Sequence, residues 1–284
     1  MFIVKISGGL GNQMFQYCFG RYLKHYYKLD IFYDVSSFDK QQEFLDKRKF
    51  ELSSLEIDIP IIDVDFFTRF KGLSNNKKIL SSLKHLMLGS KNEIIVIPES
   101  LISASYYLPS YIQNRYFLGY WQSIKYLNNK YFDFNKGFKL KNDYQKELLN
   151  YSYKDIICNS NSVSIQVRRG DYLNVGNLMC DLKYYRNALA NIENRVRNSK
   201  YFVFSDDIEW CQTELDIGAE LIFIKPNENL PFEDMHLMSL CKHNIIVNST
   251  FGWWAALMND NDDKVIISPK QWINELNLKS FIKL

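Results

Sequence analysis

The chain has 284 residues, 46% of them hydrophobic, and a formal net charge of +3, which suits a soluble globular protein of one or two domains. So small a charge gives no support to nucleic-acid binding, and no apolar run approaches the roughly 20 residues of a membrane span. The apolar start at residues 1–4 is too short for a signal peptide, so we expect a cytoplasmic protein.

The first predicted strand, residues 2–6, leads into a glycine-rich turn and an amphipathic helix. Residues 7–13 read SGGLGNQ, and apolar residues then recur at helical spacing over 14–27. A glycine loop before a helix exposes N–H groups at the positive end of the helix dipole, which suits an anion. The loop matches neither GxGxxG nor GxxxxGK[ST]. A ligand site and a turn that needs glycine for its shape are therefore both open.

The stretch from residue 30 to 160 is less regular. Strands are expected at 30–34, 94–97 and 115–121, and a helix at 143–151. The polar, lysine-rich residues 128–160 are expected to connect two halves. Trp121 and Gln122 are candidates for lining a sugar pocket, because aromatic faces stack on sugar rings. Packing of Trp121 in the core is the alternative.

The second half alternates strands and helices. Strands are expected at 163–168, 201–204, 221–224, 244–247 and 264–267. Helices are expected at about 182–197, in the residues up to 215, at 231–242 and at 252–259. This alternation predicts a parallel, doubly wound α/β sheet.

Metal and disulfide sites are not expected. The five cysteines are scattered, without CxxC or Cys/His spacing, and are interpreted as free thiols in a reducing compartment; they are Cys18, Cys158, Cys180, Cys211 and Cys241. Two Asp-x-Asp triplets, 63–65 and 260–262, have the form that holds a divalent metal on a sugar nucleotide. Such short patterns are common by chance, so neither is expected to bind metal.

Three strand-to-helix loops of the second half would meet at one edge of this sheet, because the carboxyl ends of parallel strands share an edge. They are residues 168–171, 205–207 and 248–251. The guanidinium of Arg168 matches phosphate oxygens, and Ser249 and Thr250 offer hydroxyl and N–H groups at a helix start. Asp206 or Asp207 is placed to accept N–H groups from guanine. Helix capping is the alternative for the aspartates and for the hydroxyls.

Five segments, in order along the chain, carry a family resemblance. They are GGLGNQMFQY at 8–17, GYWQS at 119–123, VRRGDY at 167–172, FSDD at 204–207 and NSTFGWWAA at 248–256. With these the sequence resembles the bacterial α-1,2-fucosyltransferases of glycosyltransferase family 11.

The resemblance implies a GT-B-like α/β fold in which two Rossmann-like halves face a central cleft. Residues 1–155 would form an acceptor-side domain and residues 156–284 a domain that binds the GDP-sugar. The implied reaction is inverting transfer of L-fucose from GDP-β-L-fucose to the 2-hydroxyl of a galactoside. No cofactor and no metal are implied.

The resemblance also implies roles for individual residues. Arg168 would contact the diphosphate. The chemistry of the transfer then favours Arg168 as the cation that stabilises the leaving group. Asp171, the nearest named carboxylate in the sequence, is a candidate for the general base or for a residue that orients Arg168. Donor contacts are implied for Gly9, Gly11, Asn12, Asp206, Asp207, Ser249, Thr250 and Phe251. Trp121 and Gln122 are kept as acceptor-side candidates because of their residue types alone.

Two positions depart from the pattern of that family. Gln166 stands where the family usually has His, and Gly252 where it often has Ser. A glutamine side chain does not exchange protons near neutral pH, which excludes an acid–base role at position 166. A hydrogen-bonding role is still open there.

The partners implied are GDP-fucose and a galactose-terminated glycan. An O-antigen unit on a lipid carrier at the inner face of the membrane follows from the bacterial resemblance alone. The alternatives are another GDP-sugar or acceptor, including a protein hydroxyl, and a non-catalytic nucleotide- or RNA-binding protein. The modest charge and the lack of an RNP-like aromatic motif weigh against RNA. The acceptor glycan and the oligomeric state are not indicated.

Overall fold

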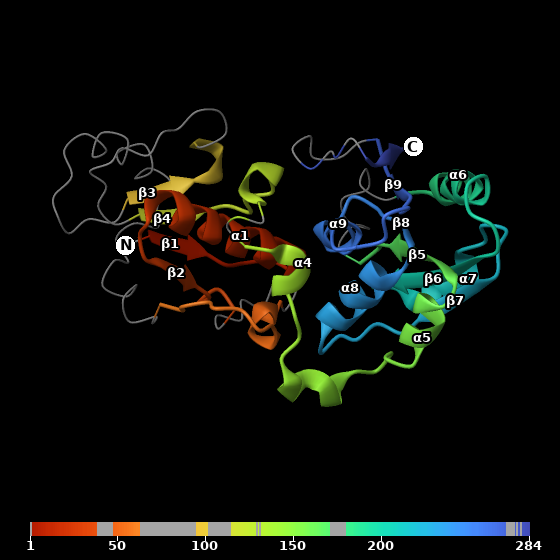
Figure 1. Cartoon of the computed structure of the whole chain (residues 1–284), viewed down its shortest axis with the longest axis horizontal. Coiled ribbons are helices and arrows are strands. Elements are labelled where there is room, and N and C mark those ends of the chain that lie inside the picture. The colour runs from red at the N-terminus through yellow and green to blue at the C-terminus, as the bar shows by residue number, and fades with distance from the viewer. Residues whose placement is uncertain are drawn as a thin grey trace. The chain divides into compact units, whose positions relative to one another are not determined.

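The computed structural model describes residues 2–38, 48–62, 95–101, 115–128, 130, 132–170, 180–270, 276, 278 and 280–284. The chain divides into two compact units, Met1–Gly137 and Phe138–Leu284, and each is described by itself (Figure 1). The division expected from the sequence, at 155/156, lies later in the chain than the observed one at 137/138. The reason is that residues just before 155 are hydrogen-bonded to the second unit. The backbone N–H groups of Leu149 and Asn150, for example, donate to the Glu233 carboxylate.

The first unit contains a parallel four-stranded sheet with the order β2-β1-β4-β3. The strands are β1 (Phe2–Lys5), β2 (Ile31–Asp34), β3 (Ile95–Pro98) and β4 (Arg115–Leu118). Strand β1 pairs with both β2 and β4, so Phe2 lies opposite Ile31 on one side and Arg115 on the other. Strand β4 ends before Gly119 rather than at residue 121 as expected.

The helices of the first unit are short apart from the first. They are α1 (Leu10–Tyr27), η1 (Glu51–Ser54), η3 (Glu99–Leu101), η4 (Ile124–Tyr126) and α4 (Phe134–Gly137). Helix α1 begins at Leu10, earlier than the expected Met14, because the N–H groups of Asn12 and Gln13 already donate to the carbonyl of Gly9. The end of the glycine motif therefore forms the first turn of the helix.

The second unit contains a parallel six-stranded sheet with the order β10-β9-β8-β5-β6-β7. The strands are β5 (Asn161–Val167), β6 (Ser199–Ser205), β7 (Leu221–Ile224), β8 (His243–Ile245), β9 (Ile266–Ser268) and β10 (Ile282–Lys283). The chain proceeds from β5 outward to β7 and then returns to the other side of β5 with β8. This order is doubly wound, as the alternation of strands and helices predicts.

Helices lie on both faces of this sheet (Figure 1). The described helices of the second unit are η5 (Asn142–Glu147), α5 (Tyr153–Cys158), α6 (Leu182–Glu193), α7 (Ile208–Glu214), α8 (Pro231–Leu240) and α9 (Thr250–Leu257). The helix expected at 143–151 is instead a short 3₁₀ helix, η5, which buries no residue. A segment without an apolar face gains no packing energy from becoming an α-helix.

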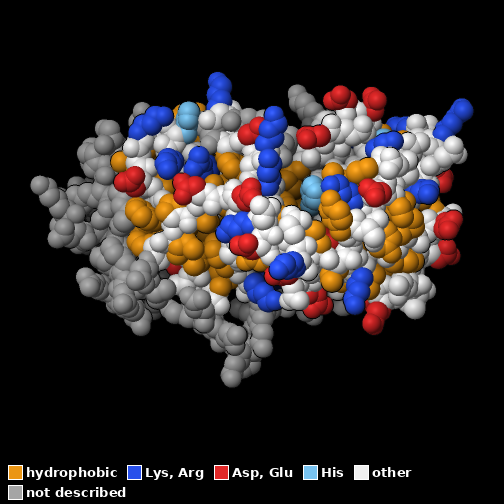
Figure 2. All heavy atoms as spheres, turned by 60° about the horizontal axis from the view of Figure 1, so that its bottom comes forward, with side chains coloured by type: hydrophobic (Ala, Val, Ile, Leu, Met, Phe, Trp, Pro, Cys, Tyr) orange, Lys and Arg blue, Asp and Glu red, His pale blue; other side chains and the backbone are white. Residues whose placement is uncertain are grey.

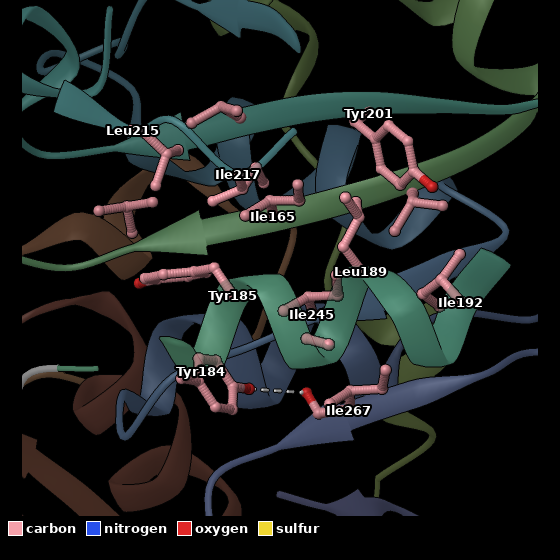
Figure 3. Close-up of a cluster of buried hydrophobic side chains, with 14 of the residues drawn as sticks. Ile165, Tyr184, Tyr185, Leu189, Ile192, Tyr201, Leu215, Ile217, Ile245 and Ile267 are labelled. Carbon is pink, nitrogen blue, oxygen red and sulfur yellow. Dashed lines mark hydrogen bonds between the residues drawn. The ribbon is translucent and has the colours of Figure 1, made fainter. Parts of the chain in front are cut away.

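The two faces of β5 meet different helices, because side chains alternate along a strand. Val163 and Ile165 face α6 and pack with its Tyr185 and Leu189 in a buried apolar cluster (Figure 3). The hydroxyl of Tyr184 extends this contact across the sheet, where it donates to the carbonyls of Ile246 and Ile267. The even-numbered residues of β5 alternate to the opposite face, where Gln166 meets Gly252 of α9.

Basic and acidic side chains are interspersed with hydrophobic ones on the face shown in Figure 2, and neither sign of charge forms a large patch on this face. This distribution agrees with the small net charge of +3. Among the described residues, no helix has both the length and the apolar character needed to cross a membrane.

Candidate functional site

The candidate site lies at the switch point of the second sheet. Strands β5 and β8 are neighbours there, with Ser164 opposite Asn244, although β6 and β7 separate them in the chain. Open α/β sheets bind ligands beyond the carboxyl ends of their strands at such a reversal. The loops at this edge carry Arg168 after β5, Asp206 after β6 and Ser249 after β8, so the strand order brings the three predicted loops to one edge.

Asp206 holds the arginine loop in place. Its Oδ2 lies 2.9 Å from Nη1 of Arg168, and its Oδ1 accepts a hydrogen bond from the backbone N–H of Arg169 at 2.9 Å. The Arg168 and Asp206 side chains are 22% and 23% exposed. Arg168 is thus oriented by a carboxylate and still reaches solvent, as a residue that meets a ligand must.

Arg169 has a different environment from Arg168. Its Nε donates to Oδ2 of Asp207 at 3.0 Å, and its guanidinium lies 3.8 Å from the centre of the Trp210 ring. Asp207 also caps α7, since its Oδ1 accepts from the backbone N–H of Trp210 at 3.2 Å. The capping alternative therefore holds for Asp207. Trp210 was not among the predicted residues, because its contact with Arg169 joins the loop after β5 to helix α7, which are far apart in the chain.

The loop after β8 does not use its hydroxyl for capping. Ser249 is the residue that precedes α9, and its side chain makes no cap hydrogen bond. Its backbone N–H donates to the carbonyl of Val247 at 2.6 Å, which turns the chain sharply before the helix. Ser249, Thr250 and Phe251 are all partly exposed, so the loop that was predicted to bind phosphate is open to solvent.

The two departures from the family pattern are in contact with each other. Gln166 is buried at the end of β5, and its Oε1 accepts from the backbone N–H of Val247 at 3.3 Å. The amide lies where a side chain on Gly252 would be. Sequence reasoning treated positions 166 and 252 separately, because nothing local relates a residue in β5 to one in α9.

The glycine motif of the first unit is held by glutamine side chains. Gln13 is buried and donates to the carbonyls of Gly8 and Lys49, each at 2.8 Å. Gln16 is also buried, and its amide connects the motif to the residue after β4 by donating to the carbonyl of Gly119 at 2.9 Å. Gly8 has φ +76°, a conformation that favours glycine. The turn therefore needs glycine for its shape, as the alternative interpretation proposed.

The predicted contacts of the first unit are only partly brought together. Asn12 and Gln122 meet, with Nε2 of Gln122 donating to Oδ1 of Asn12 at 2.8 Å. Gly9 precedes α1, and Gly11 is buried in its first turn. Trp121 is fully buried, and its ring stacks on Phe19 with 3.9 Å between ring centres. A ring in this position does not reach a sugar from solvent, so the structure supports core packing for Trp121.

Several predicted residues bear on acid–base or metal chemistry. Asp171 and the triplet 63–65 lie outside the described residues. The triplet 260–262 lies in the turn between α9 and β9, and within the described ranges no group of three or more His, Cys, Asp or Glu residues gathers.

The expected free thiols are present at all five cysteines. Burial raises the pKa of Cys211, beside the 205–207 loop, to about 11, which disfavours the thiolate form at neutral pH.

Asp234, in the first turn of α8, is expected to make stability depend on pH. Burial raises its pKa from 3.8 to about 7, and its Oδ1 is buried without a hydrogen-bond partner among the described residues. Between these pH values the folded state keeps a proton that the unfolded state has released, so the free energy of unfolding falls as pH rises. Asp234→Asn does not ionise, so its free energy of unfolding is expected to fall between pH 5 and pH 8 by about 2–3 kcal/mol less than that of wild type.

Urea denaturation at the two pH values measures this difference. Burial also raises the pKa of Glu51 in the first unit to about 7, so some pH dependence is expected to persist in the variant. Equal losses in wild type and Asp234→Asn would contradict the assignment.

Known proteins resemble this chain, and two of them do so over 98% of its length. The family model described as Glycosyl transferase family 11 matches residues 1–281. An O-antigen biosynthesis glycosyltransferase, WbnK, from Escherichia coli is 30% identical over 98% of this chain and 99% of that protein. An alpha-1,2-colitosyltransferase from the same species is 30% identical over 98% of this chain and 94% of its own length. A human galactoside alpha-(1,2)-fucosyltransferase 1 matches at 33% identity over 35% of this chain and 29% of its own.

Solved structures support the fold. The crystal structure of the fucosyltransferase NodZ from Bradyrhizobium aligns with a TM-score of 0.57 at 13% identity, over 90% of this chain and 92% of that one. Together with the two parallel-sheet units, this likeness confirms the predicted GT-B-like class of two Rossmann-like halves. The family match and the two full-length relatives make the chain a glycosyltransferase. It belongs to glycosyltransferase family 11.

Proposed function

We propose that the chain transfers L-fucose from GDP-β-L-fucose to the 2-hydroxyl of a galactoside with inversion at the anomeric carbon. Support comes from relatives that are named as an alpha-1,2-colitosyltransferase and a galactoside alpha-(1,2)-fucosyltransferase. The single observation that carries the proposal is the ion pair of Arg168 with Asp206 at the switch point of a doubly wound sheet, the place where such sheets bind nucleotides. Family membership disfavours the alternative of a non-catalytic RNA-binding protein.

The reaction places most of its developing charge on the leaving diphosphate. The acceptor hydroxyl attacks C1 of the fucosyl group from the face opposite GDP, the C1–O bond to the β-phosphate breaks, and the acceptor proton passes to a base. A fixed cation aimed at the departing phosphate stabilises this transition state more than the ground state. Arg168 provides that cation, and Asp206 keeps its guanidinium in place.

The remaining donor contacts belong to the proposal. Ser249 and Thr250 supply hydroxyl and N–H groups to the phosphates at the start of α9, and Phe251 borders the base. Asp206 and Asp207 remain the residues proposed to accept hydrogen bonds from guanine. Each also forms an ion pair with an arginine. Gly9, Gly11 and Asn12, in the glycine motif, are proposed to contact the donor. Asp171 is kept as a candidate base or as a second residue that orients Arg168.

Gly170→Ala is expected to lower kcat/KM about 10- to 100-fold with little loss of stability. A Cβ on residue 170 would lie 2.5 Å from Oδ2 of Asp206, the atom that binds Arg168. The new methyl group would push the carboxylate away, so that Arg168 loses its orientation. Steady-state kinetics and a melting curve test this. The exposed Gly218, which has no atom within 4 Å of an added Cβ but has φ +82°, is the control: Gly218→Ala should affect stability and not kcat/KM.

Independence from metal is also part of the proposal, because Arg168 and helix N–H groups provide the charge that a cation would otherwise supply. Full activity in EDTA is expected, and a strict requirement for manganese would contradict it.

Colitose is the second candidate donor sugar. The reason is the full-length relative named as an alpha-1,2-colitosyltransferase. A panel of GDP-fucose and GDP-colitose, each with a set of β-galactosides, separates the two. Linkage analysis of the product by NMR then tests the 2-hydroxyl. An α-1,2-fucosyl product supports the proposal, whereas transfer of colitose alone, or another linkage, overturns it.

The acceptor is proposed to be a galactose-terminated O-antigen unit carried on a lipid at the inner face of the membrane. Support comes from the relative named for O-antigen biosynthesis. Comparing transfer to a soluble galactoside with transfer to the same unit on a polyprenyl diphosphate tests the lipid link. Equal kcat/KM for the two acceptors would contradict it.

A further inference from the structure

Gln166 and Gly252 form a contact that the proposed reaction does not yet use. A Cβ placed on Gly252 would overlap Oε1 of Gln166 and lie 2.7 Å from its Cδ and 3.2 Å from its Nε2. All three of the nearest atoms belong to Gln166. The glutamine amide therefore occupies the space that any larger residue at position 252 would need.

Glycine at position 252 is explained by this contact and not by backbone geometry. Gly252 lies inside α9, which runs from Thr250 to Leu257, and glycine is about 1 kcal/mol less favourable than alanine inside a helix. The positive-φ glycines of the described chain are Gly8 and Gly218, so residue 252 does not need glycine for an unusual φ. What it contributes is the missing Cβ.

Gln166 connects the two sides of the switch point. It lies in β5, two residues before Arg168. Its Oε1 accepts a hydrogen bond from the backbone N–H of Val247, the residue at which the turn to Ser249 begins. Its own carbonyl accepts from the hydroxyl of Tyr185 at 3.2 Å, which ties the strand to α6. The residue is 4% exposed. One amide therefore links the strand that presents the arginine to the loop that presents the hydroxyls.

We propose that Gln166 is a positioning residue that fixes the loop after β8 relative to Arg168, and that Gly252 provides the space for its amide. The inference rests on the proposed function, because it assigns both elements to the same diphosphate. Gln166 acts through the backbone of Val247 and does not itself react. A second consequence follows from this contact. The effects on stability of substitutions at 166 and 252 depend on each other, because a larger residue at 252 needs the space that the Gln166 amide fills.

The coupling is tested without any substrate. Gly252→Ala is expected to lower the melting temperature in the wild-type background, where the new Cβ meets the amide. The same change made on top of Gln166→Ala is expected to have little effect, because the amide is gone. A Gly252→Ala penalty of the same size in both backgrounds would overturn the contact.

The positioning role is tested by the affinity for GDP, measured by calorimetry. Gln166→Met keeps the size of the side chain and removes the acceptor, and it is expected to weaken GDP binding about 3- to 10-fold. The matched control is Ser164→Ala, which removes another buried link between β5 and β8, the 2.8 Å hydrogen bond from Asn244 Nδ2 to Ser164 Oγ. That control lies further from the sheet edge and is expected to lower stability without changing GDP affinity.

The outcomes separate the two proposals. Wild-type affinity for GDP in Gln166→Met, or an equal loss in Ser164→Ala, overturns the positioning role and leaves the proposed function standing. Absence of GDP binding by the wild-type protein overturns the proposed function, and the positioning role with it. Weakened binding in Gln166→Met alone supports the inference.

Discussion

Arg168→Ala is expected to lower kcat/KM for sugar transfer about 10²- to 10³-fold while the protein stays folded. The guanidinium is the cation that the proposed mechanism places on the leaving diphosphate, and nothing replaces it in the variant. Its ion pair with Asp206 is partly exposed, and such pairs contribute about 1 kcal/mol or less to stability. Asp206 also keeps its hydrogen bond from the Arg169 backbone, so the loop retains its shape.

Arg168→Lys is expected to be nearly as inactive. Lysine keeps the charge but presents a single nitrogen, whereas the arginine fork offers donors to a carboxylate and to a phosphate at once. Steady-state kinetics with the donor varied, together with melting curves, measure both effects. Arg186→Ala is the matched control, because its ion pair with Asp216 is 4.0 Å long and well exposed. Transfer by either Arg168 variant at the rate of this control would contradict the mechanism.

Glu233→Ala is expected to lower the free energy of unfolding by about 3–5 kcal/mol. The Glu233 side chain is 3% exposed. Its carboxylate accepts the backbone N–H groups of Leu149 at 3.0 Å and Asn150 at 2.7 Å, and the amide of Asn227 at 2.6 Å. Truncation leaves three donors without their acceptor, two of them on the buried residues Asn150 and Asn227, and frees the segment that fastens residues 149 and 150 to the rest of the second unit.

Urea denaturation measures this loss. Glu228→Ala, an exposed glutamate in the adjacent loop, is expected to change stability by less than about 0.5 kcal/mol. Glu233→Gln keeps one carboxamide oxygen and should fall between the two. If Glu233→Ala unfolds at the same urea concentration as Glu228→Ala, the carboxylate is not what holds this segment.

Local patterns in the sequence were sufficient for most of the second unit. The strand expected at 221–224 is β7 without change, and the helix expected from Pro231 is α8, because proline suits the first helical turn. Helix α6 ends at Glu193 and not at 197. Strand β10, of two residues, and helix α5, of six, were not predicted, because so few residues show no periodicity.

Local patterns are enough to predict which residues follow each strand. Because parallel strands all end on one side of their sheet, the same patterns predict that Arg168, Asp206 and Ser249 share an edge. Which of the side chains near this edge touch one another follows from the fold. Asp206 binds Arg168, Asp207 binds Arg169, and Gln166 fills the space beside Gly252. Periodicity reports a segment's own environment, whereas these contacts depend on strand order, which reverses between β5 and β8 and places residues far apart in the chain against each other.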